Sequence, residues 1–160
     1  MVRRLQQTDR EIYLQAAHEF YHSPAVLHPV PDSYLEKTFE ECMKDAAYAQ
    51  GYILEYEGNA AGYALTAKTF SQEAGGYVYW LDELYVKKEY RSKGLGKEFF
   101  AYMEEHRDKD VRRFRLEVEA DNTRASALYK SLGYENLEYV QMVKEFQEGN
   151  QDGRDRTKKD

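Results

Sequence analysis

Residues 81–100 read LDELYVKKEYRSKGLGKEFF, in which a strand-like run passes through a glycine turn directly into an amphipathic helix. The run that contains its first part, YVYWLDELYV, is apolar on both faces, which predicts a strand in the middle of a sheet. Two glycines in the turn tolerate open backbone dihedral angles and let a ligand approach the main chain. N–H groups without an intrahelical acceptor then project from the start of the helix, where the helix dipole favours an anion. Together with Arg91, Lys93 and Lys97, the turn therefore predicts a pyrophosphate-binding site.

This turn differs from two common phosphate-binding motifs. No Gly-Lys-Ser/Thr follows its first glycine at the spacing of a Walker loop, and Phe99 stands where a dinucleotide-binding turn has its third glycine. The two glycines alone are equally consistent with a tight strand-to-helix turn that binds nothing. Other motifs in the chain are therefore needed to distinguish a pyrophosphate-binding turn from a turn that binds nothing.

Hydrophobic periodicity and turn residues divide the chain into elements in the order β-α-α-β-β-β-α-β-α-β. No internal repeat is present, so the pattern predicts one α/β domain with a mixed sheet over residues 1–146. Residues 147–160, QEGNQDGRDRTKKD, contain no apolar anchor and are predicted to form a disordered polar tail. The predicted elements are a strand at 2–6, helices at 8–22 and 31–47, a hairpin at 51–70, a strand at 77–86, a helix at 94–109, a strand at 113–120, a helix at 123–134 and a last strand at 139–146.

The composition limits the class of function. The chain has 160 residues, of which 42% are hydrophobic and 32% charged, as in one soluble domain. A formal net charge of -6 argues against nucleic acid as a partner and weakly favours cationic small molecules. The only cysteine, Cys42, excludes an internal disulfide and is interpreted as a buried thiol. No apolar run has the length of a signal peptide or a membrane span, so we expect a cytoplasmic protein that binds no membrane.

A second motif indicates different chemistry. Residues 18–28 read HEFYHSPAVLH, in which His18 and His22 could bind zinc from one helix face with Glu19 as a base. His28 follows at the distance of a third ligand, but Ala25 stands where that pattern has a glycine. A zinc hydrolase would also leave the glycine turn unexplained. We therefore expect no metal and keep the zinc-dependent hydrolase as an alternative.

Two motifs together resemble the Gcn5-related N-acetyltransferase (GNAT) superfamily. The first is the loop pattern [QR]-x-x-G-x-[GA], matched by residues 91–96 and preceded by the strand motif LYV at 84–86. The second is N-x-x-A-x-x-L-Y-x-x-x-G-[FY], matched by Asn122, Ala125, Leu128, Tyr129, Gly133 and Tyr134. The resemblance implies a mixed, mostly antiparallel twisted sheet with helices on both faces.

The resemblance also implies acetyl-CoA as cosubstrate and assigns residues to it. In the superfamily the strand before the loop splays from its neighbour and pairs with the pantetheine arm, a role that falls to Leu84, Tyr85 and Val86. The pyrophosphate would be held by the amides of Arg91, Ser92, Lys93, Gly94, Leu95, Gly96 and Lys97. Asn122 and Ser126 would contact the cosubstrate from the next helix, and Tyr129 would stand near its sulfur.

Acetyl transfer from a thioester to an amine needs a base for the amine, a donor for the oxyanion and an acid for the thiolate. The resemblance assigns the acid to Tyr129 and the oxyanion donor to the N–H of Val86. Asp82 and Glu83 are candidates for the base, because a carboxylate in an otherwise apolar strand has a raised pKa. The strand resembles that of the polyamine-acetylating relatives, in which a carboxylate at the position of Asp82 is a proposed base, so Glu83 is the alternate. Adjacent strand residues point to opposite faces, so we expect only one of them to face the acceptor. Ordinary packing of Tyr129 and a structural ion pair for either carboxylate are the alternatives.

The sequence does not identify the amine that accepts the acetyl group. In the superfamily the first two helices cover the acceptor side of the sheet, so Tyr21, His22, Ser23 and Tyr34 are candidates for the acceptor pocket. We expect an N-acetyltransferase that transfers acetyl directly to a primary amine of a small molecule, such as a polyamine-like cation, or of a protein. A non-catalytic acyl-CoA-binding module is the remaining alternative, and a homodimer is an open expectation.

Overall fold

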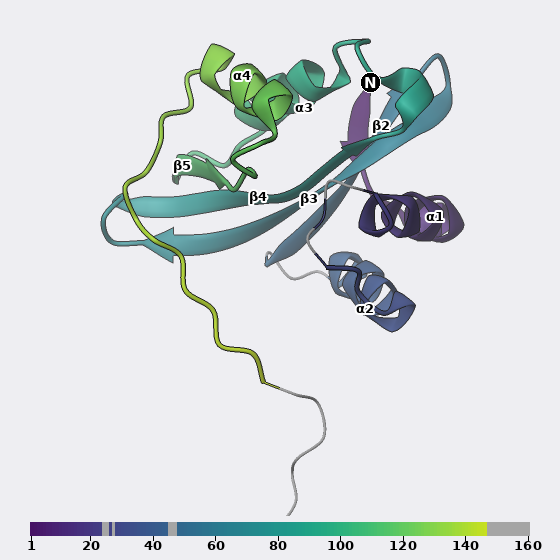
Figure 1. Cartoon of the computed structure of the whole chain (residues 1–160), viewed down its shortest axis with the longest axis horizontal. Coiled ribbons are helices and arrows are strands. Elements are labelled where there is room, and N and C mark those ends of the chain that lie inside the picture. Colours follow the sequence, from purple (N-terminus) through teal and green to yellow (C-terminus); the bar gives the residue numbers. More distant parts are fainter. Residues whose placement is uncertain (24–25, 27, 45–47, 147–160) are drawn as a thin grey trace, which may run out of the picture.

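The computed structural model describes residues 1–23, 26, 28–44 and 48–146, and the predicted tail 147–160 lies outside these ranges. Its elements follow the predicted order as far as the last helix (Figure 1). They are β1 (Val2–Arg4), the 3-10 turn η1 (Gln7–Asp9), α1 (Arg10–Tyr21), α2 (Asp32–Met43), β2 (Ala49–Tyr56), β3 (Asn59–Ser71), β4 (Gly76–Val86), the 3-10 turn η2 (Lys88–Tyr90), α3 (Leu95–Glu105), β5 (Val111–Leu116) and α4 (Thr123–Ser131).

The five strands form one sheet in the order β1-β2-β3-β4-β5. The first four strands pair antiparallel, whereas β4 and β5 pair parallel. Figure 1 shows α1 and α2 on one face of the sheet and α3 and α4 on the other. The predicted fold class, a mixed and mostly antiparallel sheet with helices on both faces, is therefore confirmed.

Each face of the sheet has its own hydrophobic core, because strand residues alternate between the faces. Leu95, Phe99 and Met103, one helical turn apart on α3, are buried against the sheet. On the opposite face, Tyr13 of α1 and Phe39 of α2 are each 1% exposed. The two cores have no buried residue in common, so the sheet separates two independently packed layers.

A β-bulge interrupts β4 at Asp82. Leu65 of β3 lies opposite Glu83, and the next residue of β3 lies opposite Leu81, so Asp82 has no partner in the register. Before the bulge Tyr79 and Leu81 pack on the α3 side, and beyond it Leu84 and Val86 do so. The extra residue thus reverses the phase of the strand and turns Glu83 toward α1 and α2.

The prediction of a strand at residues 139–146 is wrong, because the structure has no strand there. Residues 135–146 follow α4 as an extended segment without a sheet partner, and Val140, Met142 and Phe146 are 84–94% exposed. The alternation of apolar residues is present, but a strand also requires a neighbouring strand to satisfy its backbone groups.

None of the helices in the described ranges has the length and apolar character needed to span a bilayer.

Candidate active site

The parallel pair β4–β5 opens at the level of Asp82. Its register runs from Tyr77 opposite Val111 to Leu81 opposite Leu116, where β5 ends. From Glu83 to Val86, β4 pairs with β3 on one side, and within the described part of the chain no strand pairs with its other backbone edge. The Nε of Arg91 donates to the carbonyl oxygen of Val86 at 3.0 Å and holds the following turn against this edge. The predicted splay at residues 84–86 is therefore present in the pairing.

The glycine turn fits an anion at the start of α3. Gly94 is the N-cap with a φ of +84°, and nothing lies within 4 Å of the position that a Cβ would occupy there. A Cβ on Gly96 would lie 3.2 Å from Cδ2 of Leu128, so this glycine allows α4 to approach α3 closely. The guanidinium of Arg124 donates to Oγ of Ser92 at 2.9 Å and ties α4 to the turn. Open space and the first N–H groups of a helix form a suitable cradle for a pyrophosphate.

Both carboxylate oxygens of Glu83 accept a hydrogen bond from a tyrosine hydroxyl. Its Oε1 accepts a hydrogen bond from the hydroxyl of Tyr21 at 2.5 Å, and its Oε2 accepts one from Tyr63 at 2.5 Å. Burial raises the pKa of Glu83, while the two hydroxyl donors act in the opposite direction. Burial together with the charge of Glu83 raises the pKa of both tyrosines, so they remain protonated donors. These three side chains form a hydrogen-bonded cluster between α1 and the sheet.

Asp82 is in a different situation from Glu83. Partial burial of its carboxyl raises its pKa to about 6, and the negative charges of Glu83 and Glu117 act in the same direction. The residue still has an open path to solvent, and its carboxyl accepts no hydrogen bond from another described residue. The negative charge of Asp82 also raises the pKa of Tyr21, although burial and Glu83 contribute more. The contacts place Glu83 on the α1 face, and the expectation that only one of the two carboxylates faces the acceptor stays a prediction.

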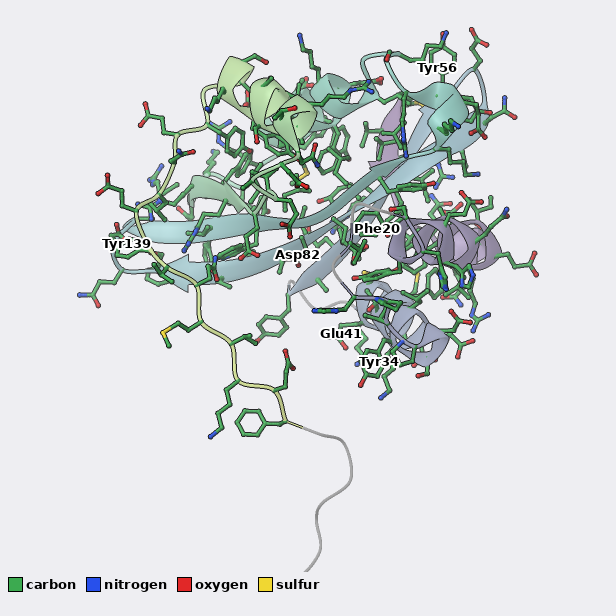
Figure 2. All side chains as sticks on the ribbon, in the orientation of Figure 1. Phe20, Tyr34, Glu41, Tyr56, Asp82 and Tyr139 are labelled. Atoms are coloured by element: carbon green, nitrogen blue, oxygen red, sulfur yellow. The ribbon has the colours of Figure 1, made fainter. Side chains whose placement is uncertain are left out.

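The four residues predicted to line the acceptor pocket differ in their contacts. Tyr21 reaches Glu83, but Ser23 Oγ donates to the carbonyl of Phe20, and Nδ1 of His22 lies 2.8 Å from the carbonyl oxygen of His18. Tyr34 is 45% exposed on α2 and lies away from Asp82 (Figure 2). The roles of His22, Ser23 and Tyr34 as pocket residues stay predictions.

Sequence reasoning missed two residues of this site. Tyr63 holds Glu83, and Glu19 accepts a hydrogen bond from the hydroxyl of Tyr85 at 3.2 Å. Tyr63 lies directly opposite Tyr85 in the β3–β4 register. The alternation along β3 places Tyr63 on the α1 face, but only the register shows that it reaches Glu83.

The histidines of HEFYHSPAVLH show no arrangement for a metal ion. The rings of His18 and His22 stack with centroids 4.0 Å apart, and Nδ1 of His18 lies 3.0 Å from Oδ1 of Asp32. Within residues 1–23, 26, 28–44 and 48–146, no three His, Cys, Asp or Glu side chains gather in a way that could hold one.

Tyr129 lies on the other side of the sheet. Its ring packs edge-on against Phe100 of α3 with centroids 5.6 Å apart, and burial raises its pKa, so the hydroxyl is protonated at neutral pH. Together with Ser126 it lines a cavity of about 1210 Å³ between β5, α4 and the segment after α4, whose lining includes neither Asp82 nor Glu83. Asn122 caps α4, because its Oδ1 accepts a hydrogen bond from the N–H of Ala125 at 3.2 Å. The cosubstrate contacts of Asn122, Ser126 and Tyr129 stay predictions.

The geometry described so far, a sheet that opens beside a glycine turn at a helix start, defines a coenzyme-binding α/β protein. The model of the acetyltransferase (GNAT) family matches residues 9–134, so the chain belongs to this family. The resemblance seen in the sequence is thereby confirmed, and the chain is an N-acetyltransferase that uses acetyl-CoA as cosubstrate.

The names of two similar proteins state amine substrates. Spermine/spermidine N(1)-acetyltransferase of Bacillus subtilis (strain 168) is 28% identical over 110 residues, which cover 64% of this chain and 72% of that protein. Thialysine N-epsilon-acetyltransferase of Bos taurus is 39% identical over 77 residues, covering 48% of this chain and 45% of that protein. The structure of AAC(6')-Iy in complex with the bisubstrate analog CoA-S-monomethyl-acetylneamine matches with a TM-score of 0.76 at 20% identity, covering 91% of this chain and 97% of that one. At this identity the last likeness concerns the fold.

Proposed function

We propose that this enzyme transfers acetyl directly from acetyl-CoA to a primary amine of a small cationic acceptor of the polyamine type. The observation that carries the proposal is the pair of carboxylates at the β4 bulge, Asp82 and Glu83, at the point where the sheet opens. A third carboxylate, Glu19, lies above the same strand through its hydrogen bond to Tyr85. A negative wall of this kind attracts ammonium groups. The spermine/spermidine and thialysine enzymes among its relatives also act on cationic amines, as their names state.

The chain's own residues fit acetyl-CoA. The turn from Arg91 to Lys97 would hold the pyrophosphate with its backbone N–H groups, and the open edge of Leu84, Tyr85 and Val86 would align the pantetheine arm. When bound, acetyl-CoA supplies an activated acyl group as a thioester. The N–H of Val86 would then donate to the thioester carbonyl and stabilise negative charge on its oxygen.

Asp82 is the better candidate for the base. With a pKa of about 6 it is mostly ionised at pH 7, and it still accepts protons more readily than an ordinary aspartate. Glu83 has both oxygens occupied by tyrosine hydroxyls, so it fixes negative charge beside the acceptor instead of exchanging protons. Tyr129 would donate its proton to the departing sulfur. A direct transfer fits the state of Cys42, because burial raises the pKa of its thiol to about 11 and makes it a weak nucleophile.

A screen of acetyl-CoA thiol release across amine classes tests the proposal. We expect the highest kcat/KM for spermine and spermidine, less for thialysine and lysine, and least for an aminoglycoside or a peptide N-terminus. Tyr129→Phe should lower kcat on the best acceptor by about tenfold or more, while the matched variant Tyr134→Phe should not. If activity were highest on peptides, the acceptor would be a protein and not a small cation. If the protein bound acetyl-CoA but acetylated no amine, a non-catalytic acyl-CoA-binding module would be favoured. A cytoplasmic location stays a prediction.

A further inference from the structure

The turn between β4 and α3 contains two residues in the left-handed conformation. Ser92 has a φ of +65°, and Gly94 has one of +84°. Glycine adopts this conformation readily, whereas a side chain disfavours it by roughly five- to thirtyfold. Among the described residues the other non-glycine case is Glu57, which the two-residue hairpin turn between β2 and β3 explains. Ser92 lies outside the strands, so other contacts have to hold its conformation.

Arg124 provides such a contact from α4. Its Nη2 donates to Oγ of Ser92 at 2.9 Å, across 32 positions of the sequence. A hydrogen bond from a charged donor is stronger than one between neutral groups. The bond fixes the side chain of Ser92 relative to a helix, and a fixed side chain limits the rotation of its own backbone. Arg124 therefore opposes the return of Ser92 to a conformation with a negative φ.

The side chains on either side of Ser92 are tied to two further elements. Nε of Arg91 donates to the carbonyl oxygen of Val86 at the end of β4, at 3.0 Å. Nζ of Lys93 lies 5.7 Å from the ring centroid of Tyr56 at the end of β2, a favourable contact between a cation and an aromatic face. Three consecutive side chains thus tie the turn to β4, α4 and β2, which assigns ligand binding to the N–H groups at the start of α3.

α4 keeps its place without Arg124. Figure 1 shows it on the same face of the sheet as α3. Cδ2 of Leu128 lies 3.2 Å from the position that a Cβ would occupy on Gly96, so the two helices are in close contact. The ring of Tyr129 packs on Phe100 of α3 with centroids 5.6 Å apart. Loss of the Arg124 side chain should therefore release the turn and leave α4 docked.

We propose that Arg124 is a positioning residue for acetyl-CoA, which holds Ser92 in the left-handed conformation before the cosubstrate binds. A site that is in its binding conformation in only a fraction of the molecules binds more weakly by that fraction. Arg124 raises this fraction, so it strengthens binding through Ser92 and without a contact of its own to the cosubstrate. The inference rests on the pyrophosphate placement proposed above and is independent of the acceptor amine.

Calorimetry with CoA and steady-state kinetics test the role of Arg124. Arg124→Ala should weaken CoA binding and raise the KM for acetyl-CoA by about fivefold, with kcat within about twofold of wild type, because Tyr129 keeps its place. Arg107→Ala removes the same side chain from an exposed position just after α3, and it should change neither quantity. Equal losses in both variants, or a lower kcat with unchanged CoA binding, would overturn the proposal.

A glycine at position 92 separates positioning from direct contact with a phosphate. Glycine needs no support in the left-handed conformation, so the turn should no longer depend on Arg124. In a Ser92→Gly background, Arg124→Ala should weaken CoA binding by less than about twofold. An arginine that binds a phosphate itself would cost the same affinity in both backgrounds, and that result would overturn the proposal.

The ligand-free protein allows a third measurement. NMR order parameters of the backbone amides of residues 92–94 should be lower in Arg124→Ala than in wild type, and unchanged values would overturn the proposal. Gly94→Val tests the placement of the pyrophosphate separately. If this variant still bound CoA, the pyrophosphate would lie elsewhere and the proposal would fall with that placement. If Gly94→Val lost binding while Arg124→Ala bound normally, only the role of Arg124 would be overturned.

Discussion

Tyr63 of β3 donates a hydrogen bond to Oε2 of Glu83 in the neighbouring strand β4, with the two oxygens 2.5 Å apart. The bulge at Asp82 makes this contact by turning Glu83 toward α1, where Tyr21 donates to the other carboxylate oxygen. One carboxylate thus joins a helix to two strands at the place where the sheet begins to open. Glu83 therefore stabilises the packing of α1 on the sheet in addition to its proposed role beside the acceptor.

The stability of this three-residue contact can be measured by a double-mutant cycle. Tyr63→Phe should lower the free energy of unfolding by about 1–3 kcal/mol, because a hydrogen bond to a charged group is lost at a buried site. Tyr21→Phe, at a less buried hydroxyl, should have a smaller effect, and the two should not add, since both act on Glu83. Urea denaturation measures all four proteins. Tyr77→Phe, at a residue 38% exposed, is the control, and additive effects would argue against a shared contact.

The pH dependence of the reaction should report Asp82. A base must be ionised, so kcat/KM for the best amine should fall as the pH drops through about 6, the pKa of Asp82, in addition to the effect of amine protonation. Asp82→Asn should remove this limb and lower the rate by about 10²–10⁴-fold. Glu117→Gln removes a negative charge that raises the pKa of Asp82, so the limb should shift to lower pH without loss of the plateau. An unchanged limb in Asp82→Asn would assign the base elsewhere.

Two glycines of the same conformation separate backbone strain from cosubstrate binding. Gly94 and Gly58 have φ values of +84° and +80°, with open space at each Cβ position. Replacement of either by alanine should lower the stability by about 1–2 kcal/mol, because the left-handed conformation disfavours a side chain. Only changes at Gly94 should weaken acetyl-CoA binding in calorimetry, and Gly94→Val should abolish it. Normal binding by Gly94→Val would remove the pyrophosphate from this turn.

A separate ion pair should set the stability at acid pH. The guanidinium of Arg3 holds Asp9 by two hydrogen bonds of 2.7 and 2.9 Å, and Asp9 is 4% exposed. This contact lowers the pKa of Asp9 below its ordinary value of 3.8. A lowered pKa stabilises the fold above that value, and the contribution is lost as the pH falls below about 4. Asp9→Asn should cost about 3 kcal/mol at pH 7, and the difference from wild type should shrink toward pH 2 in urea titrations.

The sequence predicted the elements whose signals are local. The strand through Val86, the glycine turn and the helix after it are contiguous, and their motif was sufficient to infer the cosubstrate. The bulge at Asp82 was not predictable, because a one-residue offset depends on the opposite strand β3 and leaves the apolar pattern of β4 almost unchanged. Tyr63 and Glu19 were missed for the same reason, since their contacts join residues 20 and 66 positions apart. The last strand was predicted from alternation alone, which contains no information about a pairing partner.

Because the interior is divided into two cores, substitutions in one layer of the enzyme need not disturb the other. Leu95, Phe99 and Met103, which follow the glycine turn on α3, belong to one core, and Tyr13 of α1 and Phe39 of α2 belong to the other. Changes in α1 and α2 can therefore accumulate without disturbing the glycine turn. New acceptor preferences should be obtainable by exchanging residues 10–43 among related enzymes, provided that each graft preserves the contacts of Tyr21 with Glu83 and of Glu19 with Tyr85.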